Sequence, residues 1–351
     1  MRTHSPVVSS RRWLLVALLG LLAMGRQATS AEPHGLDIYF IDTEGGAATL
    51  LVTPAGESIL IDSGNPGDRD AHRIAAAAHD AGITAIDHYI TTHWHSDHVG
   101  GAGPLSKLLP IHARYGHQIP SPLPDDINAP LIDAWKGLEG EPQFLEAGQS
   151  MKFKGAHGTP DLQIKVMAAD GLVIGEKAGA PQVVTCDDGN QARPEDTSDN
   201  ARSLAMLISY GTFNMFAGGD LTWNVEHKLT CPKRLVPIVD VYLVDHHGLD
   251  LSNNPTLVAA LGPEVAVVNN GPRKGAEDKT MDLLLKQVGE VGVFQLHRNV
   301  RDGARNTDPA RIANVDETCG GSYIRLRVDR GGEHYAMEVP SRETVRQYDA
   351  R

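Results

Sequence analysis

The chain has 351 residues, of which 41% are hydrophobic and 22% are charged, and its formal net charge is −12. These proportions are those of an ordinary globular protein, and they exclude a disordered, collagen-like or coiled-coil chain. An acidic surface repels phosphate backbones, and the sequence contains no long run of Lys or Arg. We therefore do not expect nucleic acid as a partner.

The first 31 residues have the three parts of a signal peptide. Arg11 and Arg12 precede an apolar run at 13–24, and small residues follow at 28–31. The apolar run is shorter than the roughly 20 residues that span a bilayer, so we expect no stable membrane insertion after cleavage. The sequence predicts a periplasmic or secreted protein, exported by the general route or, because of the arginine pair, by the twin-arginine route.

Cleavage would leave residues 32–351 as the mature domain. It would remove four arginines and no acidic residue, so the formal charge would change from −12 to −16. The three cysteines, Cys186, Cys231 and Cys319, do not have zinc-finger spacing. An exported protein can hold one disulfide and one free thiol, and the sequence does not select the pair.

The first part of the mature sequence alternates strands with a helix. Strands are expected at 36–41, 48–53 and 58–62, followed by a helix at 69–81 that ends at Gly82 and an apolar strand at 86–91. Strand, helix and strand within this distance predict a right-handed crossover in a layered α/β fold.

The second part has a long irregular stretch and then more strands. Residues 170–202 are rich in Gly, Asp, Pro and Asn, which predicts a loop. Further strands are expected at 203–210, 213–216, 236–244, 264–268, 291–295, 323–328 and 334–339, and helices near 255–261 and 278–288. Strands that cluster early and late, with helices between them, predict two sheets covered by helices.

The candidate functional site begins directly after the strand at 86–91. The string HWHSDH at residues 93–98 places three imidazoles and a carboxylate within six positions, and two glycines follow at 100 and 101. Such groups are costly to bury unpaired. One or two divalent cations would satisfy them, because imidazole and carboxylate suit Zn²⁺ and also iron or manganese. We expect His93 and His95 to share one metal, and Asp97 and His98 to face a second.

This string resembles the H-x-H-x-D-H signature of the metallo-β-lactamase superfamily. Asp62 in an Asp-Ser-Gly run, Asp220 after two glycines, and the Asp-His-His-Gly string at 245–248 agree with the same family. The sequence looks most similar to the metallo-hydrolase domain associated with DNA-uptake competence channels and to its secreted stand-alone relatives. The resemblance implies a four-layer αββα sandwich, in which two mixed sheets are flanked by helices.

The resemblance also implies roles for individual residues. Asp62 would orient the histidine loop, Asp220 would bridge two metals, and His247, which precedes the glycine, would be the last metal ligand. His246 would then be free for proton transfer, although a structural histidine is an equally good interpretation. Which of the two adjacent histidines binds metal is left open by the sequence.

One element of the family pattern is missing. Many members have another metal histidine between the first cluster and the bridging aspartate, whereas His112, His117 and His157 lack a convincing context here. The residues that precede the strand at 203–210 are Asp199 and Asn200, with Ser203 at its start. A mononuclear site is therefore an alternative to two ions, and its ligands would be Asp97, His98, Asp220 and His247. His297 follows a strand and could point into the same cleft, but a lone histidine is more often structural.

The ligand set predicts an exported metal-dependent hydrolase that uses a metal-bound hydroxide. Its substrate would be a small molecule or an ester or phosphoester, with an ester, phosphodiester or lactone-like bond as the target. Asp97 and His246 are the candidate catalytic residues. Three alternatives stay open: a nuclease or phosphodiesterase that acts on nucleic acid, an iron oxidoreductase on the same fold, and a non-catalytic exported binding protein with a degenerate metal site. The oligomeric state does not follow from the sequence.

Overall fold

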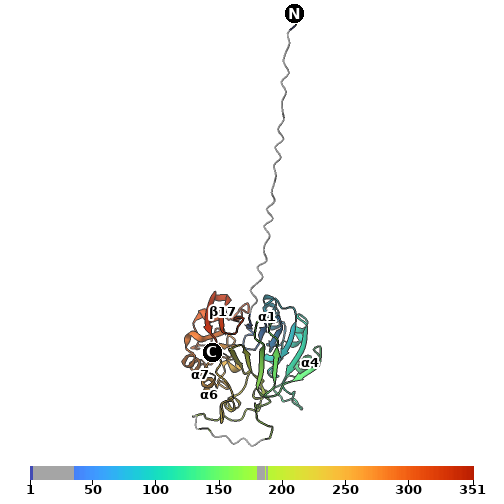
Figure 1. Ribbon diagram of the computed structural model, residues 1–351. Helices are drawn as coiled ribbons and strands as arrows, with labels where there is room; N and C mark the ends of the chain where they lie inside the picture. Colours follow the sequence, from blue (N-terminus) through green and yellow to red (C-terminus); the bar gives the residue numbers. More distant parts are fainter. Residues whose placement is uncertain (3–34, 180–185, 187–188) are drawn as a thin grey trace. The chain divides into compact units, whose positions relative to one another are not determined.

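Two sheets of mixed direction form the centre of the protein (Figure 1). The structure is a computed structural model that describes residues 1–2, 35–179, 186 and 189–351. All but the first two residues of the predicted signal peptide therefore lie outside the described residues. Within the described part of the chain, no helix is long and apolar enough to cross a membrane.

The first sheet has the order β18-β17-β16-β1-β2-β3-β4-β5-β6. Its strands are β1 (Asp37–Phe40), β2 (Thr49–Val52), β3 (Ser58–Ile61), β4 (Ile86–Ile90), β5 (Ile111–Gly116), β6 (Pro142–Phe144), β16 (Ile324–Val328), β17 (His334–Val339) and β18 (Thr344–Asp349). The pairs from β3 to β6 are parallel, and the other pairs are antiparallel. The chain thus returns to this sheet at its C-terminal end, where β16 pairs with β1.

The second sheet has the order β15-β14-β13-β12-β11-β10-β8-β7, and β9 pairs with β8. Its strands are β7 (Ser150–Phe153), β8 (Leu162–Ala169), β9 (Leu172–Val173), β10 (Ala205–Tyr210), β11 (Phe213–Ala217), β12 (Val241–Leu243), β13 (Val265–Val268), β14 (Val293–His297) and β15 (Ile312–Asn314). The pairs from β11 to β15 are parallel, and the other pairs are antiparallel.

Alternating apolar residues create three hydrophobic layers. In β1, Ile38 and Phe40 join a core that also contains Ile164 and Met206 of the second sheet, whereas Tyr39 joins the core under the first group of helices. Successive side chains of a strand point to opposite faces, so each sheet packs on the other sheet with one face and on helices with the other. The predicted four-layer arrangement is confirmed.

Helices cover both outer faces. The first group consists of α1 (Asp68–Asp80), α2 (Ser96–Val99), α3 (Ala102–Ser106) and α4 (Ala129–Lys136), and the second of α5 (Trp223–Lys228), α6 (Pro255–Leu261) and α7 (Asp278–Gln287). Figure 1 shows α1 and α4 on the opposite side of the strands from α6 and α7. Buried residues of α1, α3 and α4 pack on the first sheet, and those of α5, α6 and α7 pack on the second.

Some elements differ from the sequence-based prediction. The strand expected at 236–244 is shortened to Val241–Leu243, and Pro237 in its first half has no N–H for a ladder. The predicted loop at 170–202 contains β9 and a 3₁₀ turn at Asp199–Arg202. Strand β8 was not predicted, although its residues alternate between apolar and polar types from Leu162 to Val166.

A disulfide joins Cys186 to Cys231, and Cys319 has a free thiol. The bond ties the middle of the irregular segment to the residues that follow α5. The structure therefore selects a pair that the sequence left open.

Candidate metal centre

The candidate site forms where strands of both sheets end. β4 leads into the histidine loop and α2, β11 leads into the glycine pair before Asp220, and β12 leads into a 3₁₀ turn at Asp245–Gly248. All three strands belong to the parallel parts of their sheets. Parallel strands place their carboxyl ends at one edge, where α/β folds commonly bind ligands. The three loops accordingly meet at that edge.

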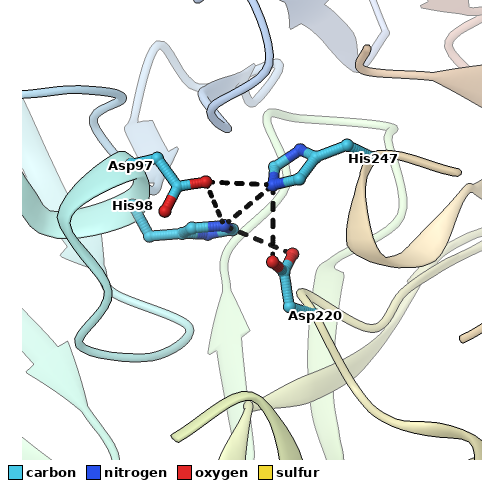
Figure 2. Close-up of side chains that lie close together, drawn as sticks. All are labelled: Asp97, His98, Asp220 and His247. Carbon is cyan, nitrogen blue, oxygen red and sulfur yellow. Dashed lines mark hydrogen bonds and ion pairs between the residues drawn. The ribbon is translucent and has the colours of Figure 1, made fainter. Parts of the chain in front are cut away.

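Four side chains from these loops converge on one point (Figure 2). Asp97, His98, Asp220 and His247 each offer one ligand atom, and these atoms lie within 4.8 Å of one another. His98 Nε2 is 3.2 Å from Asp220 Oδ1 and 3.3 Å from His247 Nε2, and His247 Nε2 is 3.2 Å from Asp97 Oδ2. The structure thus brings together the four residues of the mononuclear alternative.

The hydrogen bonds behind His98 prepare it to bind a cation. Its Nδ1 lies 2.7 Å from Asp62 Oδ2, and the same carboxylate accepts hydrogen bonds from Thr92 N and Thr92 Oγ1, both at 2.7 Å. A carboxylate only accepts, so Nδ1 carries the proton and the lone pair is left on Nε2, which faces Asp220 and His247. This carboxylate–histidine arrangement is typical of metal ligands.

The electrostatics of the group also favour a cation. Burial would lower the pKa of His98, but the carboxylates of Asp220, Asp62 and Asp97 raise it well above its ordinary value. Burial would raise the pKa of Asp220, but His247, His98 and His246 hold it well below the ordinary range. The buried carboxylates therefore favour a positive charge between the four side chains. The chemistry of the donors, two imidazoles and two carboxylates, fits a divalent transition metal.

His93 and His95 lie beside this group but not within it. His93 Nε2 is 3.9 Å from Asp220 Oδ2, is fully buried, and has no hydrogen-bond partner among the described residues. His95 points elsewhere: its Nε2 lies 3.0 Å from Asp126 Oδ2. A second ion between His93 and Asp220 would satisfy the orphaned nitrogen of His93, whereas His95 would have to leave Asp126 to join it.

The three polar residues that stand in place of the missing histidine all contact the site. Asp199 Oδ2 accepts a hydrogen bond from Trp94 N at 2.6 Å, inside the histidine loop. Asn200 Nδ2 is 3.5 Å from His246 Nε2, and Ser203 Oγ accepts from Asp220 N at 3.2 Å. These residues hold the loops of the site in position.

The two adjacent histidines both approach Asp220, but only His247 belongs to the group of four. His247 enters the group of four, whereas His246 Nε2 lies 3.4 Å from Asp220 Oδ2 and its Nδ1 lies 3.1 Å from Ser252 Oγ. Burial lowers the pKa of His246, so its neutral form is favoured. Both residues have positive φ, 52° and 55°. Such strained backbone is costly and occurs at functional sites, and here it turns two consecutive imidazoles toward the same carboxylate.

Glycines allow the loops to approach closely. A Cβ on Gly101 would collide with the carbonyl oxygen of Ser63, and one on Gly218 would collide with the carboxylate of Asp245. Both positions therefore require glycine for the loops to pack this closely.

Two contacts were not predicted from the sequence. Lys274 Nζ forms an ion pair with Asp97 Oδ2, and Asp126 accepts from His95. Lys274 lies in a loop 177 positions after Asp97 in the sequence, and Asp126 lies in an irregular segment. Neither residue belongs to a sequence pattern that would have indicated its contact with the site.

Three further histidines lie outside the group of four. His117 is buried, with Nδ1 3.1 Å from Asp170 Oδ1 and Nε2 3.2 Å from Asp199 Oδ2. His112 is exposed and faces Asp87. His297 does not join the group of four but lies with Asp42 and Cys319. None of these histidines replaces the missing ligand.

Residues 42–171 match the family model of the metallo-beta-lactamase superfamily. The match covers less than half of the chain, and it shows that these residues are similar to that superfamily. The matched residues include Asp62 and the string at 93–98, whereas Asp220 and His247 follow them in the chain. The superfamily includes metal-dependent hydrolases.

Short stretches of the chain are similar to curated proteins. It is 35% identical over 65 residues to an atrochrysone carboxyl ACP thioesterase of Aspergillus terreus, which covers 18% of this chain and 20% of that protein. It is 38% identical over 71 residues to metallo-beta-lactamase domain-containing protein 1 of Rattus norvegicus, which covers 20% of this chain and 28% of that protein. The matches thus span about a quarter of the length of these relatives.

Solved structures are similar at lower identity. CmlA, a diiron beta-hydroxylase from Streptomyces venezuelae, has a TM-score of 0.43 at 13% identity, with 75% of this chain and 53% of that chain covered.

Proposed function

We propose that the chain is an exported metal-dependent hydrolase whose principal cation is held by Asp97, His98, Asp220 and His247. The observation that carries the proposal is the convergence of these four donors within 4.8 Å, together with the Asp62 contact that leaves His98 Nε2 free to bind. His93 and His95 are proposed ligands of a second ion, with Asp220 shared between the two positions. Zn²⁺ fits these donors, and iron or manganese would fit them as well.

A bound divalent cation lowers the pKa of a coordinated water and polarises a carbonyl or phosphoryl oxygen. Proton transfer would then be carried out by residues of the chain. The side chain of Asp97 is 16% exposed, against 4% or less for the other three, so Asp97 faces the substrate side and is placed to orient water or accept its proton. His246, kept neutral by burial, can take a proton at Nε2, beside Asp220 and Asn200.

The substrate that we propose is a small molecule with an ester, phosphodiester or lactone-like bond. The name of the Aspergillus relative, a thioesterase, supports an acyl substrate, and the likeness to the competence-type group supports a phosphoester. The net charge of −12 weighs against nucleic acid. The name of CmlA, a diiron hydroxylase, keeps an iron oxidoreductase as the second candidate. The metal content of native protein would separate the two.

Export is part of the proposal. The pattern of residues 1–31 supports it, and the Cys186–Cys231 disulfide supports an oxidising compartment. N-terminal sequencing of protein from the native host should give a chain that begins near residue 32. A cytoplasmic protein that begins at Met1 would contradict export without affecting the site.

The hydrolase is tested by a panel of ester, lactone, thioester and phosphodiester substrates, before and after chelation. We expect activity on at least one class, loss of activity with the metal, and recovery when Zn²⁺ is added back. Removal of the ion should also lower the melting temperature, because a ligand at a thousand times its Kd stabilises the native state by about 4 kcal/mol. Full activity in a His95→Ala, Asp97→Ala double variant would overturn the proposal. His334→Ala is the control, since that histidine is exposed and pairs with Asp349 at 2.8 Å, away from the group of four.

A further inference from the structure

A second group of potential metal ligands lies outside the centre described above. One ligand atom each from Asp42, His297 and Cys319 lies within 4.8 Å of the others. Asp42 follows β1, His297 ends β14, and Cys319 belongs to the loop before β16. The group therefore joins both sheets, and none of its members takes part in the proposed hydrolase chemistry.

His297 is oriented as metal-binding histidines commonly are. Its Nδ1 lies 3.1 Å from the carbonyl oxygen of Arg298, and a carbonyl only accepts, so Nδ1 carries the proton. The lone pair is then on Nε2, which has no hydrogen-bond partner among the described residues. The side chain is fully buried. Ligating histidines commonly donate their other N–H to a backbone carbonyl in this way.

Asp42 and Cys319 supply the other two donors. Cys319 Sγ donates a hydrogen bond to Asp42 Oδ2 at 3.2 Å, and Asp42 is fully buried. Burial and the nearby Asp42 raise the pKa of the Cys319 thiol to about 11, so without a cation this sulfur keeps its proton. Thiolate, imidazole and carboxylate together are a typical ligand set for Zn²⁺, with the fourth tetrahedral position open.

The guanidinium of Arg73 would compete with a cation for Asp42 and Cys319. Its Nη1 lies 3.4 Å from Asp42 Oδ2 and its Nη2 lies 3.6 Å from Cys319 Sγ, so it opposes a second cation there. The same guanidinium also pairs with Glu44 at 2.8 Å. Because Glu44 offsets part of the positive charge, Arg73 should weaken a metal site without excluding one.

We propose that Asp42, His297 and Cys319 form a second, separate binding site for a thiophilic divalent cation such as Zn²⁺. Binding forms a metal–sulfur bond and releases the thiol proton to solvent, and nothing is oxidised or reduced. The site would fasten the loop that follows β1. Ala47 N of that loop donates to the carbonyl oxygen of Asp97 at 3.1 Å, so the cation would also steady the proposed catalytic loop.

Cobalt(II) tests the proposal, because a thiolate–cobalt bond gives a charge-transfer absorption in the near ultraviolet. Cys186 and Cys231 are joined in a disulfide, so the thiolate signal of the folded chain reports Cys319. Metal-free full-length protein, with one free thiol verified by titration after denaturation, is titrated with Co²⁺. We expect the thiolate band to appear as Co²⁺ is added.

Variants assign the band to the three residues. Cys319→Ser should abolish it, His297→Gln and Asp42→Asn should weaken Co²⁺ binding at least tenfold, and Arg73→Met should tighten it several-fold. His247→Ala should keep the band while the principal centre loses its ion, so the two proposals can fail independently. No band in the wild-type protein, or an unchanged band in His297→Gln, would overturn the proposal. If a variant does not fold, alkylation of Cys319 in the wild-type protein is measured with and without Zn²⁺ instead. We expect Zn²⁺ to slow the alkylation, and an unchanged rate would overturn the proposal.

Discussion

The Asp62 carboxylate lies 2.7 Å from Nδ1 of His98 and holds the other nitrogen of that ring toward Asp220. Asp62 has a φ of 60°. Its carboxylate also accepts hydrogen bonds from the backbone N–H and the hydroxyl of Thr92. One side chain therefore fixes the tautomer of a proposed ligand and the shape of the loop that carries it.

Asp62→Asn should weaken metal binding about 10- to 100-fold, the usual effect of losing such a supporting contact. Asparagine has one oxygen where aspartate has two, and its NH₂ only donates, so it cannot accept at both the Oδ1 position, which faces Thr92 N, and the Oδ2 position, which faces His98 Nδ1. Competition with a chromophoric chelator measures the affinity. Asp87→Asn is the matched control, because Asp87 also accepts a backbone hydrogen bond, from Ser58 N at 2.9 Å, but lies away from the site. Equal affinities in the two variants would refute the role of Asp62.

Asp220→Asn and His246→Ala should have different effects. Asp220 lies within 3.4 Å of three imidazole nitrogens, so its loss should lower both metal content and rate. His246→Ala should retain the principal ion and lower kcat, if His246 moves protons rather than binding that ion. Metal analysis of both variants alongside kinetics separates the roles. Loss of the principal ion in His246→Ala, with retention in His247→Ala, would show that the assignments must be exchanged.

Lys274→Met should strengthen metal binding by several-fold up to about tenfold. Lys274 pairs with Asp97 Oδ2 and so competes with a cation for that oxygen, but the lysine side chain is 41% exposed and solvent weakens its effect. Isothermal titration with Zn²⁺ gives the affinity. Lys279→Met removes a lysine that pairs with Asp250 at the surface and should change nothing. Weaker binding in Lys274→Met would mean that the lysine supports the loop instead.

His117→Gln should destabilise the protein more at acidic than at alkaline pH. Burial would lower the pKa of His117, but hydrogen bonds to Asp170 and Asp199 raise it above its ordinary value. The protonated form is therefore favoured by folding. Its contribution is fully present below the unfolded pKa of about 6.5 and is lost as the pH rises through the higher folded value.

Urea unfolding of chelator-treated wild type and variant across this range measures the difference. His112→Gln is the control, because that histidine is exposed. A destabilisation by His117→Gln that does not change with pH would contradict a charged His117.

The sequence by itself determined the types and order of the residues that converge. The dense string at 93–98, the aspartate after Gly218-Gly219 and the histidine pair before Gly248 each follow a strand, and local periodicity is enough to recognise a strand end. The early and late clusters of strands, with helices between them, likewise predicted two sheets covered by helices, and the resemblance to a known family implied the sandwich.

Only the tertiary structure decided which of these residues contact one another and which join the group of four. His247, not its neighbour, enters the group of four, and both residues have left-handed backbone. His95 turns to Asp126, Lys274 reaches Asp97, and His297 joins Asp42 and Cys319. Each of these contacts joins residues far apart in the chain. Sequence patterns record the local periodicity of a segment, whereas such contacts depend on how whole sheets and loops pack.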